Sequence, residues 1–326
     1  FDCVQVGFNV CTNLLVLKYK FNRSPVKLKI IVIFTVELTK NMISKEQFEN
    51  ELELIIANAI REDIGDGDHT SLSCIPQNAT GKAKLLVKDE GIIAGVAFAK
   101  QVFAYVDKDL EVVTFIQDGE KVKYGDIVFL VHGRSQSILK AERLVLNAMQ
   151  RMSAIATKTA FFTALLAGTK TKVLDTRKTT PGIRAIEKWA VKIGGGVNHR
   201  FALYDMMMIK DNHIDFAGGI SAAITKAKKY LIEKKMDLNI IVEARSLEEI
   251  QEILSNTGVH RILIDNFNYE DTLKAVALIG DTCFTESSGG INEKTIRKYA
   301  DCGVDFISSG ALTHAVSNLD LSLKAV

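Results

Sequence analysis

Six short apolar segments with polar or charged ends recur through the C-terminal half of the chain: VLDTRKTT (173–180), MMMIKDNH (206–213), IIVEA (240–244), ILIDN (262–266), CFTESSGG (283–290) and DFISSG (305–310). Most of their polar ends are 22 or 23 residues apart, the length of one strand, one helix and two short loops. This period predicts parallel strand–helix units, and we assign residues 151–326 to an α/β barrel-like domain. Since the carboxyl end of each barrel strand opens into the active site, we expect chemistry at the polar ends.

The composition is that of an ordinary globular enzyme. Of the 326 residues, 47% are hydrophobic and 25% are charged, and the length suffices for a barrel and a smaller domain with its own core. No apolar run approaches the roughly 18–20 residues that span a bilayer. Outside the N-terminal segment there is no basic stripe of the kind that binds nucleic acid. We therefore expect neither a membrane nor a nucleic acid as partner.

The cysteines and the N-terminal segment provide information about the cellular compartment of the protein. The five cysteines form no CxxC pair, so neither a disulfide framework nor a zinc site is indicated; a reducing compartment fits best, and we expect a cytoplasmic protein. Residues 1–41 are basic, and their apolar run Ile30–Val36 has no partner pattern. We expect an extension outside the fold. A targeting segment is the alternative, although the run is short and no Ala-x-Ala cleavage pattern follows it.

Residues 42–150 predict a small α+β domain. Met42–Glu62 places its apolar side chains largely on one helical face, with a capping-box start at Ser44 and Gln47. A long helix over about residues 135–167 leads from this domain into the barrel. Before it, four segments of strand length are separated by turn signals: 82–88, 91–96, 111–116 and 126–132.

Cations follow the first predicted barrel strand. Arg177 and Lys178 stand directly after it, and Pro181 suits the first turn of a helix whose N-terminus favours anions. Arginine binds a phosphate or carboxylate with two hydrogen bonds, and lysine adds a point charge. A solvated loop with an ion pair to Asp175 is the alternative, but the position at a strand end favours an anion site.

A second cationic group follows three glycines. Gly194–Gly196 allow the backbone to approach a ligand closely before His199 and Arg200 present their side chains. Taken alone, the glycine run also fits a flexible turn. Lys210 is the first polar residue after Met206–Ile209, which we assign to the barrel core, and it should face the barrel opening.

Carboxylates and small residues close the remaining strands. Glu243 and Asp265 end consecutive strand–helix units, where they can hold ribose hydroxyls or a metal ion and stabilise developing positive charge. Their alternative role is to neutralise the cations in a structural ion-pair network. The last two strand ends contain Ser288, Gly289 and Gly310, and small residues there allow backbone N–H groups to bind phosphate.

Seven motifs follow one another along the chain: EDIGDGDHTS, AERLVLN, DTRKTTPGIRAIEKWAVKIGGGVNHR, IKDNH, LIDN, ESSGGI and SSGALTH. In this order, from about Lys45 to the end, the chain resembles quinolinate phosphoribosyltransferase, also called nicotinate-nucleotide pyrophosphorylase (carboxylating). The pairing of DTRKT with GGGxNHR is highly specific. The resemblance implies a mixed α+β N-terminal domain and a seven-stranded, TIM-related barrel-like domain in which Val197–Arg200 is the extra strand. It also implies a homodimer whose neighbouring subunit completes each active site.

By matching position, the resemblance implies two groups of site residues. The two carboxylates of quinolinate are bound by Arg177, His199, Arg200 and Lys210, and Arg143 reaches the pocket from the partner subunit. Phosphoribosyl pyrophosphate and its Mg²⁺ are held by Lys178, Glu243, Asp265, Ser288, Gly289 and Gly310. Within this group Lys178, Glu243 and Asp265 are the expected catalytic residues, and Glu243 and Asp265 the expected metal ligands.

The implied reaction is a displacement at C1 of the ribose by the pyridine nitrogen, as pyrophosphate leaves, followed by loss of the 2-carboxylate as CO₂. The product is nicotinate mononucleotide. One departure is visible: many family members have a second acid two positions after Glu243, where this chain has Arg245. We expect Arg245 to alter the local charge without removing the main carboxylate.

Three other interpretations remain open. A barrel lyase or aldolase could use Lys210 to form a Schiff base. A relative on the same fold could use another base, such as nicotinate, or serve molybdenum transport. A non-catalytic barrel could bind a metabolite. The DTRKT and NHR cations argue against the last two interpretations, because both groups are present.

Overall fold

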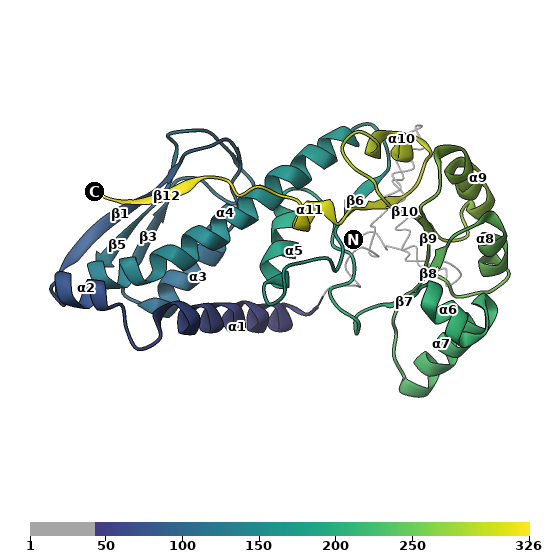
Figure 1. Cartoon of the computed structure of the whole chain (residues 1–326), viewed down its shortest axis with the longest axis horizontal. Helices are drawn as coiled ribbons and strands as arrows, with labels where there is room; N and C mark the ends of the chain where they lie inside the picture. Colours follow the sequence, from purple (N-terminus) through teal and green to yellow (C-terminus); the bar gives the residue numbers. More distant parts are fainter. Residues whose placement is uncertain (1–42) are drawn as a thin grey trace, which may run out of the picture. The chain divides into compact units, whose positions relative to one another are not determined.

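Two larger sheets organise residues 43–326, which are the residues that the computed structural model describes (Figure 1). The expected extension over residues 1–41 lies outside them. The first sheet is antiparallel, and its strands are ordered β12-β1-β5-β3. Their bounds are β1 (Thr80–Val87), β3 (Glu111–Thr114), β5 (Ile127–Arg134) and β12 (Leu321–Ala325).

The small domain also contains three helices and a short two-stranded sheet. The helices are α1 (Lys45–Ile64), α2 (His69–Cys74) and α3 (Val96–Val106), and the two strands are β2 (Gly91–Ile92) and β4 (Lys121–Val122). The capping box expected for α1 is confirmed: Gln47 N donates to Ser44 Oγ over 3.1 Å, and Ser44 N donates to Gln47 Oε1 over 2.9 Å.

The strand predicted over 91–96 is wrong beyond Ile92, because α3 begins at Val96. Gly95 turns the chain with a left-handed φ of 97°. Asp118, 22 residues away, then accepts hydrogen bonds from Val96 N and Ala97 N, at 2.8 and 3.1 Å. The first N–H groups of a helix have no partner within the helix. Here their partner, Asp118, is distant in sequence, so the local sequence contained no capping signal.

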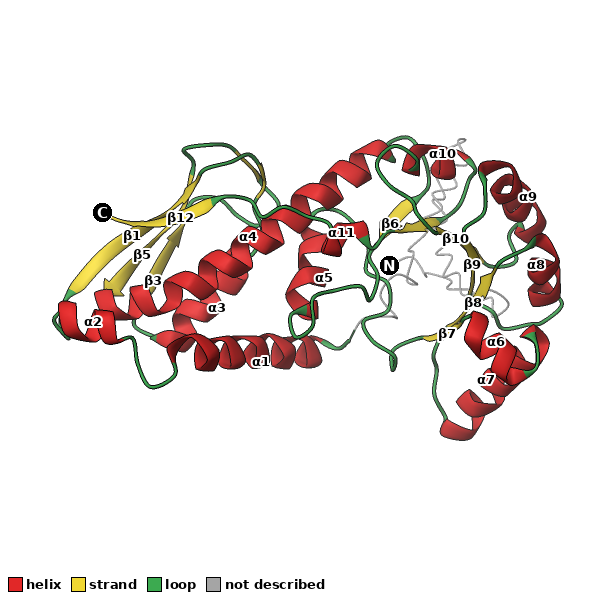
Figure 2. Ribbon diagram, in the orientation of Figure 1, coloured by secondary structure: helices red, strands yellow, loops and turns green. Residues whose placement is uncertain are grey.

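The second sheet is parallel and has six strands in the order β6-β11-β10-β9-β8-β7 (Figure 2). Its strands are β6 (Lys172–Leu174), β7 (Met207–Ile209), β8 (Ile240–Ala244), β9 (Arg261–Asp265), β10 (Phe284–Ser288) and β11 (Phe306–Ser308). The helices of this domain are α5 (Arg184–Ile193), α6 (Asp211–Ala217), α7 (Ile220–Lys234), α8 (Leu247–Leu254), α9 (Tyr269–Ile279), α10 (Ile296–Asp301) and α11 (Ala311–His314). The barrel-like α/β architecture is confirmed.

The expected extra strand is reduced to a single parallel bridge between Val197 and Leu174, beside β6. After it the chain turns away from the sheet, since Asp205 accepts hydrogen bonds from Phe201 N and Ala202 N, at 2.6 and 2.8 Å. Side-chain bonds of this kind replace the ladder bonds that a longer strand would form. Within residues 43–326, no pairing joins this bridge to β7, so the sheet is not closed by hydrogen bonds.

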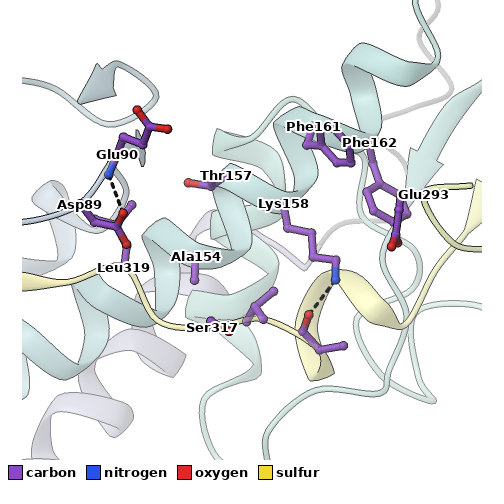
Figure 3. Close-up of a pocket in the computed structure, with 12 residues that line it drawn as sticks. Asp89, Glu90, Ala154, Thr157, Lys158, Phe161, Phe162, Glu293, Ser317 and Leu319 are labelled. Carbon is purple, nitrogen blue, oxygen red and sulfur yellow. Dashed lines mark hydrogen bonds between the residues drawn. The ribbon is translucent and has the colours of Figure 1, made fainter. Parts of the chain in front are cut away.

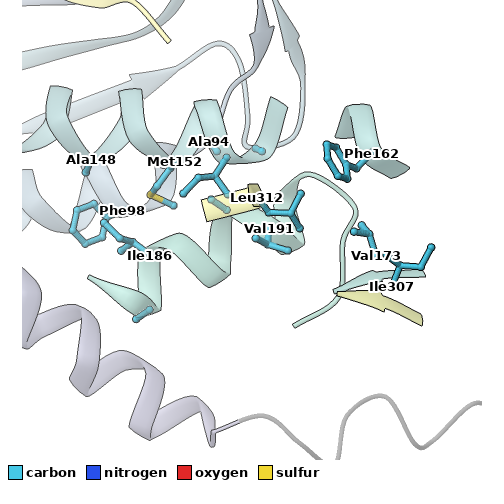
Figure 4. Close-up of a cluster of buried hydrophobic side chains, with 14 of the residues drawn as sticks. Ala94, Phe98, Ala148, Met152, Phe162, Val173, Ile186, Val191, Ile307 and Leu312 are labelled. Carbon is cyan, nitrogen blue, oxygen red and sulfur yellow. The ribbon is translucent and has the colours of Figure 1, made fainter. Parts of the chain in front are cut away.

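The long helix α4 (Ser135–Leu165) connects the two sheets, as predicted. Its Ala148 and Met152 pack with Phe98 of α3, and the same buried cluster continues to Val173 of β6 (Figure 4). Neither α4 nor any other helix between residues 43 and 326 combines the length and apolarity needed to cross a membrane.

The C-terminal strand β12 belongs to the small sheet. It pairs with β1, with Leu323 opposite Leu85. The division at residue 150, which places residues 151–326 in the barrel, does not account for this strand. The physical reason is that the apolar side chains of β12 are buried by β1, far away in sequence, and the barrel period ends before it.

Candidate active site

Alternate side chains of the barrel strands share the barrel interior. Met206, Ile241 and Leu263 come from three separate segments and pack together as a small buried cluster. Because side chains two positions apart on a strand share a face, Glu243 and Asp265 lie on the same side as Ile241 and Leu263, one step nearer the carboxyl ends. The strands therefore bring both carboxylates to the mouth of the barrel.

Lys210 and Glu243 form an ion pair at this mouth. The Lys210 ammonium nitrogen lies 2.8 Å from Glu243 Oε2, and β7 and β8 set this contact by pairing Ile209 with Val242. The Glu243 side chain is 9% exposed and that of Lys210 is 44% exposed. The sequence left open whether Glu243 neutralises a cation, and the structure shows that it does. An anion that binds Lys210 therefore lies close to the Glu243 carboxylate.

The loops after β9 and β10 are fitted closely together. Ser288 pairs with Asp265, and the next residue, Asn266, donates from its backbone N to Ser288 O over 2.9 Å and from Nδ2 to Asp265 Oδ2 over 2.6 Å. A Cβ atom on Gly289 would lie 2.1 Å from Asn266 Oδ1, and Gly289 has a left-handed φ of 100°. Any other residue at 289 would displace Asn266 and disturb Asp265.

Gly310 brings the loops after β6 and β11 together. A Cβ atom at Gly310 would lie 3.0 Å from both Lys178 Cδ and His314 Nε2. Thr313 also donates from Oγ1 to Lys178 O over 2.8 Å. His314 is exposed at the mouth and was not among the predicted site residues. The sequence feature that could have identified His314 is its position at the end of SSGALTH, four residues after Gly310.

Asp175 is fully buried and holds the second cationic group against β6. It accepts hydrogen bonds from Lys188 Nζ (2.6 Å), Asn198 Nδ2 (2.6 Å) and His199 N (2.8 Å). Burial raises the pKa of Asp175 and lowers that of Lys188, and their mutual attraction opposes both shifts. The alternative ion pair of Asp175 with the adjacent cations is therefore not formed.

Three cationic side chains lie near these loops with unequal burial. Arg177 and Lys178 are exposed, and neither forms an ion pair with any residue between 43 and 326. Arg200 is buried, and its Nη1 donates to Met206 O over 3.2 Å. Burial, and then the charge of Arg177, lowers the pKa of Arg200. Because Arg177 and Arg200 repel each other, an anion that binds between them would be favoured.

The helix start expected at Pro181 is wrong. Pro181 lies in a turn, and α5 begins at Arg184. Gly182 has a left-handed φ of 83°, which an α-helix does not contain. The buried carboxylate of Glu187 accepts hydrogen bonds from Thr180 N (3.0 Å) and Thr180 Oγ1 (2.8 Å) and holds this loop in place.

Arg151 of α4 ties this loop to the last barrel loop, a role that the sequence did not reveal. Its Nε donates to Glu187 Oε1 over 3.0 Å, and its Nη2 donates to Thr313 O. Lys178 and Gly310 thus lie on two loops that share one buried network. No local pattern on α4 distinguishes Arg151 from a surface arginine, so only the fold identifies it.

The structure places the other predicted residues as follows. Arg143 is exposed on α4, and its side chain forms no hydrogen bond or ion pair with another described residue, so nothing within residues 43–326 ties it to the strand ends. Arg245 is bound to Glu249, with Nη2 and Oε1 2.7 Å apart, rather than to Glu243. Across residues 43–326, no group of three or more His, Cys, Asp or Glu side chains could hold a metal ion by itself.

A groove of about 620 Å³ lies along α4 and the segment 315–319 (Figure 3). Phe161 and Phe162 line one end, and Lys158 crosses it to donate to Ala315 O over 2.7 Å. None of the predicted site residues lines this groove. The strand ends of the barrel, with their four cations and two carboxylates, remain the candidate active site.

Comparison with known proteins identifies the family. Two family models match consecutive parts of the chain: the N-terminal domain of quinolinate phosphoribosyl transferase over residues 68–153 and its C-terminal domain over residues 155–324. The chain is 44% identical over 289 residues to quinolinate phosphoribosyltransferase [decarboxylating] 1b of Nicotiana tabacum, covering 84% of this chain and 82% of the relative.

Two further relatives are similar over most of their length. The chloroplastic nicotinate-nucleotide pyrophosphorylase [carboxylating] of Arabidopsis thaliana is 44% identical over 289 residues, covering 84% of this chain and 82% of the relative. The solved structure of nicotinate-nucleotide pyrophosphorylase from Francisella tularensis superposes with a TM-score of 0.77 at 35% identity, covering 88% of this chain and 98% of that one.

Proposed function

Since the chain belongs to the quinolinate phosphoribosyltransferase family, we propose that it transfers phosphoribose from phosphoribosyl pyrophosphate to quinolinate and releases CO₂ and pyrophosphate. The product is nicotinate mononucleotide, a precursor of NAD. The observation that carries the proposal is the group of charged residues that follow the barrel strands: Lys210 pairs with Glu243, Arg200 feels the charge of Arg177, and Lys178 lies against Gly310.

The cations divide between two anionic substrates. Arg177 and Arg200 lie close together and suit the adjacent carboxylates of quinolinate, because a guanidinium can form two parallel hydrogen bonds to a carboxylate. Lys210 lies beside Glu243 and completes this group. Lys178 lies against Gly310, where small residues leave space for phosphate oxygens. His199, which directly precedes Arg200, is the further carboxylate ligand that the family resemblance implies.

The chemistry requires positioning rather than a covalent nucleophile. The pyridine nitrogen attacks C1 of the ribose while the C1–O bond to pyrophosphate breaks, and the ribose carries positive charge in the transition state. Glu243 and Asp265 stabilise this charge and bind ribose hydroxyls. The new pyridinium accepts the electron pair of the C–CO₂ bond as CO₂ leaves, and a proton then takes its place on the ring.

Mg²⁺ arrives with phosphoribosyl pyrophosphate, and carboxylate and phosphate oxygens are the ligands it prefers. Glu243 and Asp265 fit this role as a pair. Each has one oxygen engaged inside the chain, Glu243 Oε2 by Lys210 and Asp265 Oδ2 by Asn266, and within residues 43–326 the other oxygen has no hydrogen-bond partner. Two free carboxylate oxygens suit an ion that keeps most of its ligands from substrate and water.

Two further parts of the proposal concern assembly and location. Arg143 is exposed and unpaired within the described chain, which suits a residue that acts in the site of a partner subunit of a homodimer. The lack of a CxxC pair supports a cytoplasmic protein. Among the relatives, some plant enzymes are named as mitochondrial or chloroplastic.

The test is formation of nicotinate mononucleotide from quinolinate and phosphoribosyl pyrophosphate with Mg²⁺, with nicotinate as the control substrate. We expect product when the base is quinolinate and none when the base is nicotinate. Product from nicotinate but not from quinolinate would contradict the proposal. The Schiff-base alternative has weaker support, because the Lys210 side chain is 44% exposed and its ammonium forms an ion pair with Glu243, whereas a lysine that attacks a carbonyl is usually desolvated. Borohydride trapping with a carbonyl substrate would detect it.

A further inference from the structure

Glu286 and Arg261 form a buried polar cluster inside the barrel with His199. The proposed reaction does not itself assign a role to Glu286 or Arg261. Glu286, in the middle of β10, is completely buried, and Arg261 at the start of β9 donates from Nη1 to Glu286 Oε2 over 2.7 Å. The Arg261 guanidinium also lies 4.2 Å from the centre of the Phe306 ring. Burial raises the pKa of Glu286, but His199 and Arg261 outweigh it and hold this pKa below its usual range. The ion pair with the buried Arg261 guanidinium keeps the Glu286 carboxylate charged.

His199 connects this cluster to the site. Its Nε2 lies 3.3 Å from Glu286 Oε2, and its Nδ1 accepts a hydrogen bond of 2.7 Å from the backbone N–H of Arg200. A ring nitrogen that accepts a hydrogen bond carries no proton, so the ring proton is on Nε2 and faces Glu286. With 6% of its surface exposed, His199 has both ring nitrogens directed at the protein.

The cluster leaves polar atoms unpaired. Between residues 43 and 326, five buried side-chain atoms have no hydrogen-bond partner, and three of them belong here: His199 Nε2, which is poorly aligned with Glu286, Arg261 Nε and Glu286 Oε1. An unpaired buried polar atom destabilises the folded state, because it loses its hydrogen bonds to water and gains none. The adjacent interior cluster of Met206, Ile241 and Leu263 is wholly apolar and avoids this cost. Stability alone therefore does not explain the cluster.

We propose that Glu286 is a positioning residue for the quinolinate subsite, acting through His199 on Arg200. Glu286 selects the Nε2–H form of the imidazole and orients the ring. The His199 Nδ1 atom then holds the Arg200 backbone, while Met206 O holds its guanidinium. In this arrangement His199 and Glu286 fix the position of Arg200 in the quinolinate subsite. The inference rests on the proposed function for the identity of the substrate.

The first test measures the tautomer of His199 in the full-length protein. Long-range ¹H–¹⁵N NMR of ¹⁵N-histidine-labelled protein distinguishes a protonated from an unprotonated ring nitrogen, and His199→Gln identifies the signal among the six histidines. We expect a protonated Nε2 and an unprotonated Nδ1 at neutral pH. A protonated Nδ1 would overturn the proposal. This measurement needs no activity, so it is independent of the proposed function.

The second test compares Glu286→Gln with the matched control Asp107→Asn, a buried carboxylate that pairs with Arg134 in the small domain. In Glu286→Gln we expect the KM for quinolinate to rise about tenfold, with the KM for phosphoribosyl pyrophosphate nearly unchanged. The fixed tautomer should also be lost. The control should keep both KM values.

An unchanged quinolinate KM in folded Glu286→Gln, or an equal rise in both KM values, would overturn the positioning role. If Glu286→Gln does not fold, the double variant Glu286→Gln, Arg261→Gln removes both buried charges and is judged by the same criteria. A wild-type protein that makes no nicotinate mononucleotide refutes the proposed function, whereas the tautomer result stands by itself.

Discussion

Arg177 and Arg200 carry like charges to one site but are held in different ways. Arg177 is exposed and has no ion pair among residues 43–326, so the folded chain does not depend on its guanidinium. Arg200 is buried, and its guanidinium donates to Met206 O. We therefore expect Arg177 to contribute to binding alone, and Arg200 to contribute to binding and to the local structure.

Replacing either arginine should weaken quinolinate binding. Arg177→Ala and Arg200→Ala would each leave a substrate carboxylate unpaired, a loss of about 2–5 kcal/mol that steady-state kinetics measures. Only Arg200→Ala should also lower the melting temperature. Arg245→Ala is the matched control, because its guanidinium is bound to Glu249 on an exposed helix start. Unchanged KM and kcat in both site variants would remove these residues from the site.

At the scale of secondary-structure elements, Asp107 connects α3, β5 and α4 by hydrogen bonds. It follows α3, and its carboxylate Oδ2 accepts 2.7 Å hydrogen bonds from Arg134 Nε at the end of β5 and from Ser137 Oγ in the first turn of α4. These hydrogen bonds and the Arg134 charge hold the pKa of Asp107 below its usual range in spite of burial. A carboxyl group with a lowered pKa stabilises the folded state only while it is ionised.

Asp107→Asn should therefore destabilise the protein in a pH-dependent way. At pH 7 we expect the free energy of unfolding to fall by about 1–3 kcal/mol, since charged hydrogen bonds are lost. The stabilisation is complete above the ordinary aspartate pKa and is lost as the pH falls toward the folded value, so the difference between the two proteins should begin to shrink below about pH 4. Urea unfolding at several pH values measures this, and a constant difference from pH 7 to pH 3 would disprove the explanation.

At the scale of the whole molecule, the candidate site of one chain lacks Arg143. This residue is exposed on α4, which packs against α3 and α5 rather than against the strands β7 to β9 that carry Lys210, Glu243 and Asp265. A two-fold symmetric homodimer could bring Arg143 of one subunit to the barrel mouth of the other.

Mixing two inactive variants tests this sharing. Arg143→Ala and Lys210→Ala subunits, exchanged at random, should regain about a quarter of wild-type activity, because about half of the dimers are mixed and each of these has one intact site. Each variant incubated alone provides the control. If heterodimers form, as native mass spectrometry would show, and activity does not return, Arg143 does not act across the interface.

The residues before Met42 should be dispensable for folding and catalysis. They carry no apolar face that the sequence matches to the rest of the chain. A protein beginning at Met42 should keep the melting temperature and the kcat of the full chain. A large loss of either in differential scanning calorimetry or kinetics would show that these residues pack on the fold or complete the site.

The sequence by itself determined the features that repeat locally or have a local signal. The 22–23-residue period predicted the parallel strands, and the strand ends predicted Glu243 and Asp265, because alternation along a strand places them on one face. The capping box predicted the start of α1, and the apolar pattern predicted α4. The cations of the DTRKT and NHR motifs were visible as residue types, although their contacts were not.

Only the tertiary structure decided which distant residues meet. The cap of α3 by Asp118, the pairing of β12 with β1, and the contact of His199 with Glu286 each join residues far apart in sequence. Such a contact leaves no period or cap in either local segment, because its energy depends on burial and direction that exist only after the chain has folded. For the same reason the sequence showed that Arg200 is a cation, while the fold decided that it is buried beside Arg177.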